Sequence, residues 1–166
     1  MDYKKAQTYW KEKEASSAKM DAVTVQEKIT EYINANNTCA LATGADSFVR
    51  NTPIEYSYHD GCFWMFSEGG EKFIGLEKNP NVCIAIFDKY TGFGSLKGLQ
   101  VMGTASIVEP FSEEFNAHAT VKKIPLSALQ KMNPPMNLIK VQPVSVDFLN
   151  SDFKKDGFDS RQHIEF

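Results

Sequence analysis

Residues 60–88, DGCFWMFSEGGEKFIGLEKNPNVCIAIFD, decide the fold of this chain. Cys62–Ser67 is an apolar and aromatic run that favours a strand, and Gly69-Gly70 ends it. Lys72–Lys78 has the composition of one or two helical turns and stops before an Asn-Pro pair. Val82–Phe87 is β-branched and aromatic without an internal charge, so we expect a central strand there.

A helix and two strands are predicted before this stretch. Thr24 and Glu27 have the spacing of a capping box, which predicts a helix that runs as far as an Asn-Asn pair. Thr38–Thr43 and Phe48–Tyr58 are extended by composition, and Pro53 restricts the second of them to a sheet edge or a bulge. The turn residues after Tyr58 predict that this strand returns as a hairpin through the strand at Cys62–Ser67.

Strands dominate the rest of the chain as well. The predicted elements are a strand at Leu99–Glu109, a polar helix at 112–120 and a final strand pair, Asn137–Gln142 and Val144–Leu149. Six or seven short strands with small helical insertions favour an antiparallel β-barrel, which protects its edges by closing on itself. A parallel doubly wound sheet is disfavoured because helices do not alternate with strands.

The length of 166 residues predicts one domain with short appendages. Residues 1–22 form a charged helical extension, which we expect to dock on the domain. Residues 23–150 form the barrel. Residues 151–166 form a polar tail that we expect to pack on the barrel or on a dimer partner.

Composition excludes several functional classes. Lys and Arg total 18 against 21 Asp and Glu, so the net charge is -3 and no basic stripe predicts a nucleic-acid partner. The apolar runs are far shorter than the roughly 20 residues that span a membrane. The N-terminal residues carry charges without an apolar segment behind them, so we expect no secretory signal and a cytoplasmic protein.

No metal site or catalytic residue can be assigned from the cysteines and histidines. The three cysteines are widely spaced and form no CxxC pair, which predicts reduced, buried thiols; they are Cys39, Cys62 and Cys83. The three histidines are expected at the surface; they are His59, His118 and His163.

The loop between Ser67 and Lys72 is the candidate site. Backbone N–H groups before a helix are unsatisfied, glycines let an oxyanion approach them, and Lys72 with the Ser67 hydroxyl could complete a phosphate cradle. The alternative is a plain turn with a solvated lysine. Arg50, on a preceding strand, could reach the same phosphate or could be a surface partner for a carboxylate.

Four stretches carry a family resemblance: CALATG (39–44), VRNTPIEY (49–56), residues 60–88 and LQVMGTASIVE (99–109). Together they resemble the flavin-binding split barrels related to pyridoxamine 5'-phosphate oxidase, over about residues 25–149. The resemblance implies a mainly β (α+β) fold, a six- to seven-stranded antiparallel split β-barrel with short flanking helices. It also implies a homodimer that holds two molecules of flavin mononucleotide (FMN) at the subunit interface.

The resemblance also implies which residues bind the cofactor. Carried over by position, the residues that would line the flavin are Arg50, Asn51 and Thr52. The residues that would flank its ring and phosphate are Met65, Phe66 and Ser67. Lys72 would pair with the phosphate, and Gln100 would contact the cofactor from the interface strand.

The sequence departs from the oxidases that give the family its name. Glu71 stands where they have a basic residue before the helix lysine, and Glu55 stands where they have a lysine. Their substrate-binding arginine segment is not recognisable around Arg161. We therefore expect a flavin-dependent oxidoreductase for an unidentified small molecule, not a true pyridoxamine 5'-phosphate oxidase. The alternatives are a non-enzymatic flavin or haem binding, storage or sensor protein, and a barrel that only dimerises.

Alternation along Cys62–Ser67 predicts that Phe63 and Met65 face one side of the sheet and that Trp64 and Phe66 face the other. The strands contain more large apolar side chains than one small barrel can enclose. Some must therefore face outward, and an exposed apolar sheet face predicts a homodimer interface.

Overall fold

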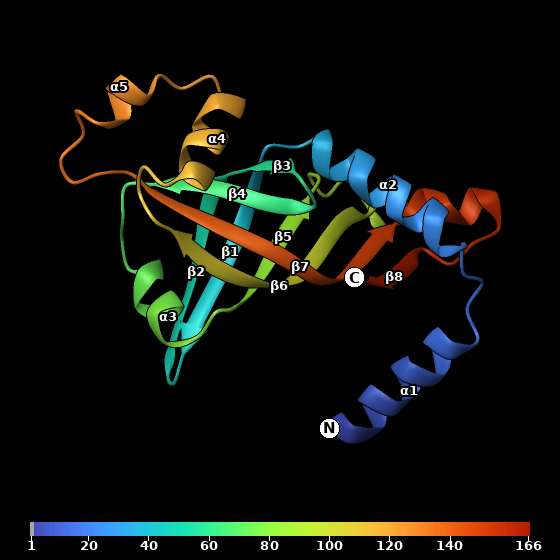
Figure 1. The fold of residues 1–166 in the computed structure, drawn as a ribbon. Coiled ribbons are helices and arrows are strands. Elements are labelled where there is room, and N and C mark those ends of the chain that lie inside the picture. The colour runs from blue at the N-terminus through green and yellow to red at the C-terminus, as the bar shows by residue number, and fades with distance from the viewer. Residues whose placement is uncertain (1) are drawn as a thin grey trace.

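The computed structural model describes residues 2–166, and in the N-terminal helix it describes only the backbone of residues 6, 7, 10, 11 and 14. One antiparallel sheet of eight strands, in the order β2-β1-β5-β6-β7-β4-β3 with β8 paired to β7, curls into a half-barrel (Figure 1). The strands are β1 (Thr38–Ala45), β2 (Phe48–Glu55), β3 (Ser57–His59), β4 (Cys62–Ser67), β5 (Asn81–Phe87), β6 (Lys97–Val108), β7 (Asn137–Asn150) and β8 (Arg161–Glu165). The helices are α1 (Tyr3–Ala15), α2 (Ala22–Asn34), α3 (Lys72–Lys78), α4 (Glu113–Val121) and α5 (Leu126–Leu129), with short 3₁₀ turns η1 (Phe93–Ser95) and η2 (Ser151–Asp156). The predicted antiparallel, mainly β fold is confirmed.

Two hydrophobic cores lie on opposite sides of β4. Phe63 and Met65 belong to the main core inside the barrel, which α2 closes at one end. Trp64 belongs to a second core, against which Phe66 packs and which α4 and α5 cover. The predicted alternation along β4 is therefore confirmed, and the segment between β6 and β7 is what hides the outward-facing aromatic residues.

The central position of β5 and the edge position of Pro53 are both confirmed. β5 pairs with β1 on one side and β6 on the other, whereas β2, which contains Pro53, pairs only with β1. The hairpin prediction holds only in part. The strand breaks at Tyr56, and only β3 pairs with β4.

The predicted capping box at Thr24 is wrong. Asp21 is the N-cap of α2, and its side chain accepts a hydrogen bond from the Thr24 N–H at 3.0 Å and another from the Thr24 hydroxyl at 2.6 Å. A carboxylate is a better cap than a threonine hydroxyl because it adds a favourable charge to the helix dipole. Asp21 therefore starts the helix, which begins at Ala22.

The predicted final strand pair is one long strand, β7, which continues through Pro143. Pro143 lies opposite Gly103, where the register shifts between β6 and β7. Proline has no N–H to donate to the neighbouring strand, and the bulge interrupts the strand pairing at this point, so no hydrogen bond is required there. The close approach requires glycine, because a Cβ at Gly103 would lie 2.6 Å from a Val141 methyl carbon.

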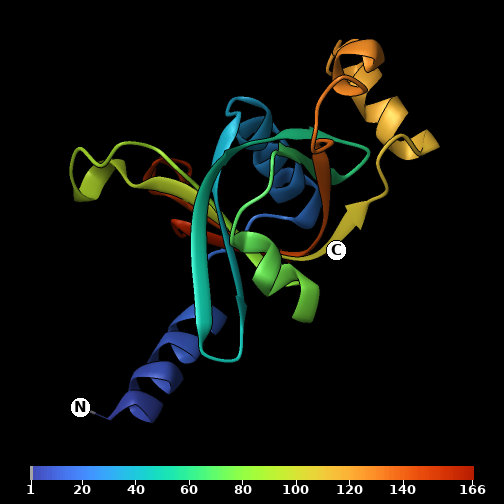
Figure 2. The same cartoon turned by 90° about the vertical axis from the view of Figure 1, so that its left-hand side faces the viewer.

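The two ends of the chain differ in how they meet the barrel. β8, in the tail, adds to the sheet beside β7, so the structure has more strands than the six or seven expected. α1 instead projects away from the barrel (Figures 1 and 2), and Tyr3 is 78% exposed. Within residues 1–22, Met20 joins the main core, and Lys13 and Lys19 line a surface hollow together with Leu149. Within residues 2–166, no helix has the length and apolar character needed to cross a membrane.

Candidate phosphate site at the barrel mouth

β2 and β4 lie close together without pairing, and α3 packs on β1 and β2 beside them; we call this end of the barrel the mouth. By alternation, Arg50 and Thr52 on β2 face the same interior side as Met65 and Ser67 on β4. Three of the predicted site residues, Arg50, Ser67 and Lys72, are brought together here.

Ser67 begins the loop at the mouth. Its Oγ lies 3.2 Å from both the backbone nitrogen and the backbone oxygen of Gly69. Gly69 and Gly70 have φ angles of 142° and 104°, which side chains other than glycine rarely adopt. The first helical hydrogen bonds are donated by Phe73 and Ile74, so the N–H groups before them take no part in α3.

Lys72 is a buried cation. Its side chain is only 7% exposed, and its ammonium donates to the Gly69 carbonyl and lies 5.2 Å from the centre of the Phe73 ring. Burial, together with the positive charge of Arg50, lowers the pKa of Lys72. In the described part of the chain no carboxylate contacts this ammonium, so a buried positive charge lacks a counter-ion. The alternative of a solvated lysine is wrong.

Arg50 is less protected, because half of its side chain is exposed. Its Nη1 atom lies 2.7 Å from Glu71 Oε2, so it does pair with a carboxylate, but one from the same glycine loop. The mouth therefore holds two cations, Lys72 and Arg50, and only Arg50 is paired with a carboxylate, the exposed Glu71.

α3 is held against β1 by a close contact. A Cβ at Gly75 would lie 3.0 Å from the Gly44 nitrogen and 3.1 Å from the Thr43 Cβ. Asn79, which follows α3, donates to the Gly44 carbonyl at 2.9 Å. α3 has only seven residues, so the dipole at its N-terminus is weak. The positive charge of the site therefore comes mainly from Lys72 and Arg50, with Ser67 as a hydrogen-bonding group.

The other predicted residues around the mouth lie in three different settings. Thr52 is half-buried on the interior side, whereas Asn51 is exposed on the opposite face of β2. The Met65 side chain is fully buried in the main core, on the same strand as Ser67. Phe66 lies on the outer side of β4, 5.5 Å from Phe115 and 5.1 Å from His118 between ring centres.

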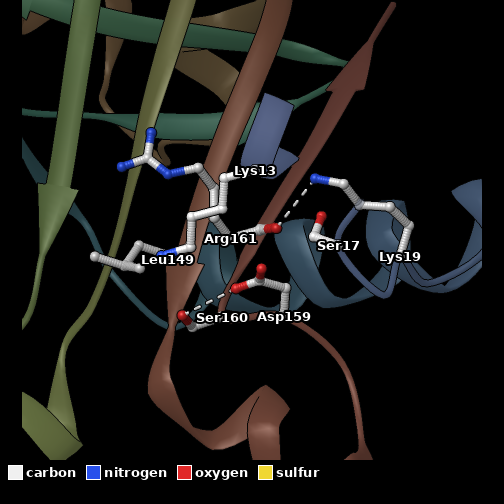
Figure 3. A pocket seen from close by; sticks show the side chains of 7 residues that line it. All are labelled: Lys13, Ser17, Lys19, Leu149, Asp159, Ser160 and Arg161. Carbon is white, nitrogen blue, oxygen red and sulfur yellow. Dashed lines mark hydrogen bonds between the residues drawn. The ribbon is translucent and has the colours of Figure 1, made fainter. Parts of the chain in front are cut away.

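Gln100 does not join this group within one chain. It lies on the outer face of the sheet, between Ala85 and Asp147, and lines a hollow of about 250 Å³. A second hollow of about 430 Å³, shown in Figure 3, shares Leu149 and Arg161 with the first and is completed by the end of α1 and residues 159–160. Neither hollow includes Arg50, Ser67 or Lys72.

The expectation of surface histidines is wrong for His118. It is 1% exposed, and burial, His59 and Lys122 together lower its pKa to about 4. The sequence missed this because the helix carrying it is polar; nothing in the local pattern marks the aromatic surface on which α4 packs.

The cysteine prediction is largely confirmed. Cys39 and Cys62 are buried, Cys83 is half-buried, and all three are free thiols. Burial raises the pKa of Cys39 to about 12, so this thiol is unreactive. Among the side chains that the structure describes, no group of three or more His, Cys, Asp or Glu residues could hold a metal ion.

Three solved structures illustrate the similarity of this fold to known proteins. An FAD-binding protein from Mesorhizobium loti is 22% identical with a TM-score of 0.57, and the match covers 73% of this chain and 89% of that protein. HutZ, a haem storage protein from Vibrio cholerae, is 20% identical with a TM-score of 0.58, covering 70% and 88%. ChuZ from Campylobacter jejuni is 21% identical with a TM-score of 0.66, covering 89% and 61%.

No curated protein matches the sequence. A model of the pyridoxamine 5'-phosphate oxidase family, however, matches residues 25–150, which include every strand of the barrel except β8. The chain therefore belongs to the pyridoxamine 5'-phosphate oxidase family.

Proposed function

We propose that this protein binds FMN with the phosphate at the mouth of the barrel. The observation that carries the proposal is the buried Lys72 ammonium, which among the described residues contacts a carbonyl and an aromatic ring but no carboxylate. A buried charge is costly without a partner, and a phosphate dianion would supply one. Membership of the family and likeness to a protein described as FAD-binding support a flavin as the bearer of that phosphate.

Each residue of the mouth has a role in this proposal. Lys72 pairs with the phosphate, and the Ser67 hydroxyl and the N–H groups of the glycine loop donate to its oxygens. Arg50 adds a second charge once it turns from Glu71. When bound, the flavin supplies hydride and electron transfer, whereas the protein binds it, orients it and excludes water. We propose a cytoplasmic oxidoreductase acting on a small molecule.

In this proposal, a second copy of the chain completes the flavin-binding site. The outer face of the sheet exposes apolar side chains, including Val49 at 81%, Phe87 at 69% and Met102 at 48%. Gln100 lies on the same face, so a homodimer formed through it would give Gln100 a place beside the partner's cofactor. A two-fold axis duplicates the site, with one FMN for each subunit.

Storage of a flavin or haem without catalysis is the second candidate. It is supported by the likeness to HutZ, which is described as a haem storage protein. Absorbance distinguishes the two ligands, because a bound flavin absorbs near 450 nm and haem gives an intense band near 400 nm. Consumption of NAD(P)H with a panel of electron acceptors would then separate an enzyme from a carrier.

Titration of FMN fluorescence tests the phosphate site. Lys72→Met keeps the length of the side chain and removes its charge, so we expect the dissociation constant to rise about 10- to 150-fold, equivalent to about 1.5–3 kcal/mol. Lys78→Met, at the other end of α3 where the lysine is exposed, is the matched control and should leave binding unchanged. Equal affinities of wild type and Lys72→Met would place the phosphate elsewhere.

A further inference from the structure

A pair of histidines joins α4 to the β3–β4 hairpin. His118 Nδ1 lies 2.9 Å from His59 Nε2, and His59 Nδ1 lies 2.9 Å from Asp60 Oδ2. His118 is fully enclosed, whereas the His59 side chain is 22% exposed. The order Asp60, His59, His118 thus runs from solvent into the second core.

The two imidazoles are stacked on Trp64. The His59 and Trp64 ring centres are 4.9 Å apart with planes 3° from parallel, and His118 lies 5.2 Å from each of these rings. These contacts hold α4 flat on the outer side of β4. No part of the proposed FMN chemistry uses them.

Charged groups surround the pair on every element packed against it. On α4 and just after it, Glu114 and Lys122 are bonded to Lys140 of β7 and Glu55 of β2, at 2.6 and 2.8 Å. The hairpin contributes Asp60 and the buried Cys62 thiol, and the Lys140 ammonium lies 4.9 Å from the centre of the Trp64 ring. The carboxylates near the pair are therefore already paired or lie on the solvent side.

His118 also contacts the end of the strand that leads into the candidate FMN site. Its ring centre is 5.1 Å from that of Phe66, and Phe66 directly precedes Ser67, which begins the glycine loop. A movement of α4 would therefore remove a support of the strand end that positions the phosphate loop.

We propose that the His59–His118 pair is an acid-sensitive latch that releases α4 from β4 when both imidazoles are protonated, and so loosens the phosphate loop through Phe66. The last step rests on the proposed FMN site, but the latch itself does not.

The hydrogen bond between the two rings explains the acid sensitivity. One ring must donate an N–H and the other must accept with an unprotonated nitrogen. Two neutral imidazoles meet this condition, and so does a pair in which only one imidazole is protonated. A second proton leaves two N–H groups facing each other and places a second positive charge near Lys122. Because the pKa of His118 is lowered to about 4 from an ordinary value near 6.5, the closed state loses stability as pH falls through this interval and keeps it above.

Trp64 fluorescence reports the latch without any ligand. In a Trp10→Phe background, emission is followed from pH 7 to pH 3.5 alongside far-ultraviolet circular dichroism. We expect the Trp64 emission to shift while the β-sheet signal persists, with a midpoint below pH 6.5. Loss of both signals together at one midpoint would mean global unfolding and would overturn the latch.

Two variants assign the transition to the pair. His118→Phe keeps a ring in the stack and cannot be protonated, so the midpoint should fall by more than about one pH unit. His59→Gln removes the other imidazole and should also lower it, which keeps the test available if the first variant folds poorly. His163→Gln, whose imidazole lies 3.1 Å from Asp147 on another part of the sheet, is the control. An unchanged midpoint in both latch variants would overturn the proposal.

FMN titration over the same pH range tests the coupling. Wild type should lose FMN affinity at the Trp64 midpoint, and His118→Phe should retain it to lower pH. If Trp64 shows the transition but FMN binds at no pH, the proposed function fails and the latch stands. If FMN binds with the same pH dependence in both proteins, the coupling through Phe66 is overturned.

Discussion

Arg50 Nη1 lies 2.7 Å from Glu71 Oε2, so one of the two cations at the barrel mouth is paired with an acidic residue of the glycine loop. Both side chains are at least half exposed, and such surface pairs contribute little to stability, in the range of about 0–1 kcal/mol. The contact therefore matters less for folding than for binding, because a phosphate must compete with Glu71 for the guanidinium.

Glu71→Gln should strengthen FMN binding. The substitution removes both the competitor for Arg50 and a negative charge that repels the phosphate, and we expect the dissociation constant to fall about three- to tenfold. Glu68→Gln, in the same loop but without an ion pair to Arg50, is the control. An equal gain in both variants would show a general charge effect and not release of Arg50.

Gly75→Ala should destabilise the protein and weaken FMN binding together. The added Cβ would press on Gly44 and Thr43 and push α3 away from β1, which displaces Lys72. Overpacking lowers the free energy of unfolding by about 1–3 kcal/mol, and the higher helix propensity of alanine offsets about 1 kcal/mol of that loss. Urea unfolding measures the loss; Gly94→Ala is the control, because nothing lies within 4 Å of its Cβ position. Unchanged stability would mean that α3 is not tightly held.

Tyr56→Phe should cost more stability than Tyr32→Phe. The Tyr56 hydroxyl donates to the buried Ile33 carbonyl at 2.7 Å, and without it that carbonyl keeps only a longer bond, 3.3 Å, from the Asn36 N–H. Tyr32 donates at the same distance to Asp88, which is exposed and can bind water instead. We expect losses of about 1–3 kcal/mol for Tyr56→Phe and about 1 kcal/mol or less for Tyr32→Phe. The reverse order in urea denaturation would contradict this account.

Met102→Asp should convert the proposed dimer to a monomer. Met102 lies at the centre of the outer sheet face, between Cys83 and Ser145, and a carboxylate there would be buried without a partner in a dimer. Light scattering should report about twice the 18.7 kDa chain mass for wild type and the single mass for the variant. Ile107→Asp has a similar exposed fraction, 47% against 48%, but lies on the opposite face of β6 and should leave the mass unchanged. A monomeric wild type that binds FMN would contradict the dimer.

Much of the candidate site was predictable because its residues are close in sequence. Ser67, the glycine pair and Lys72 lie within one loop, and Arg50 comes from a strand that the family resemblance places beside it. The alternation of Phe63 and Met65 against Trp64 and Phe66 follows from the two-residue period of any strand.

Tertiary structure decided what depends on elements that are distant in sequence. The polar helix α4 gave no sign that His118 would be buried, because only the outer side of β4 supplies the aromatic surface on which it rests. The tail gave no sign of β8, because its strand exists only by pairing with β7.

The sequence by itself determined most strands of the barrel, the helix at Lys72 and the family, since these depend on local propensity and on the order of short motifs along the chain. Only the tertiary structure decided that Lys72 is buried without a carboxylate, that Arg50 is held by Glu71, and that Pro143 continues a strand opposite Gly103. Burial and charge pairing depend on which strands become neighbours, and sheet order is set by the packing of the whole core.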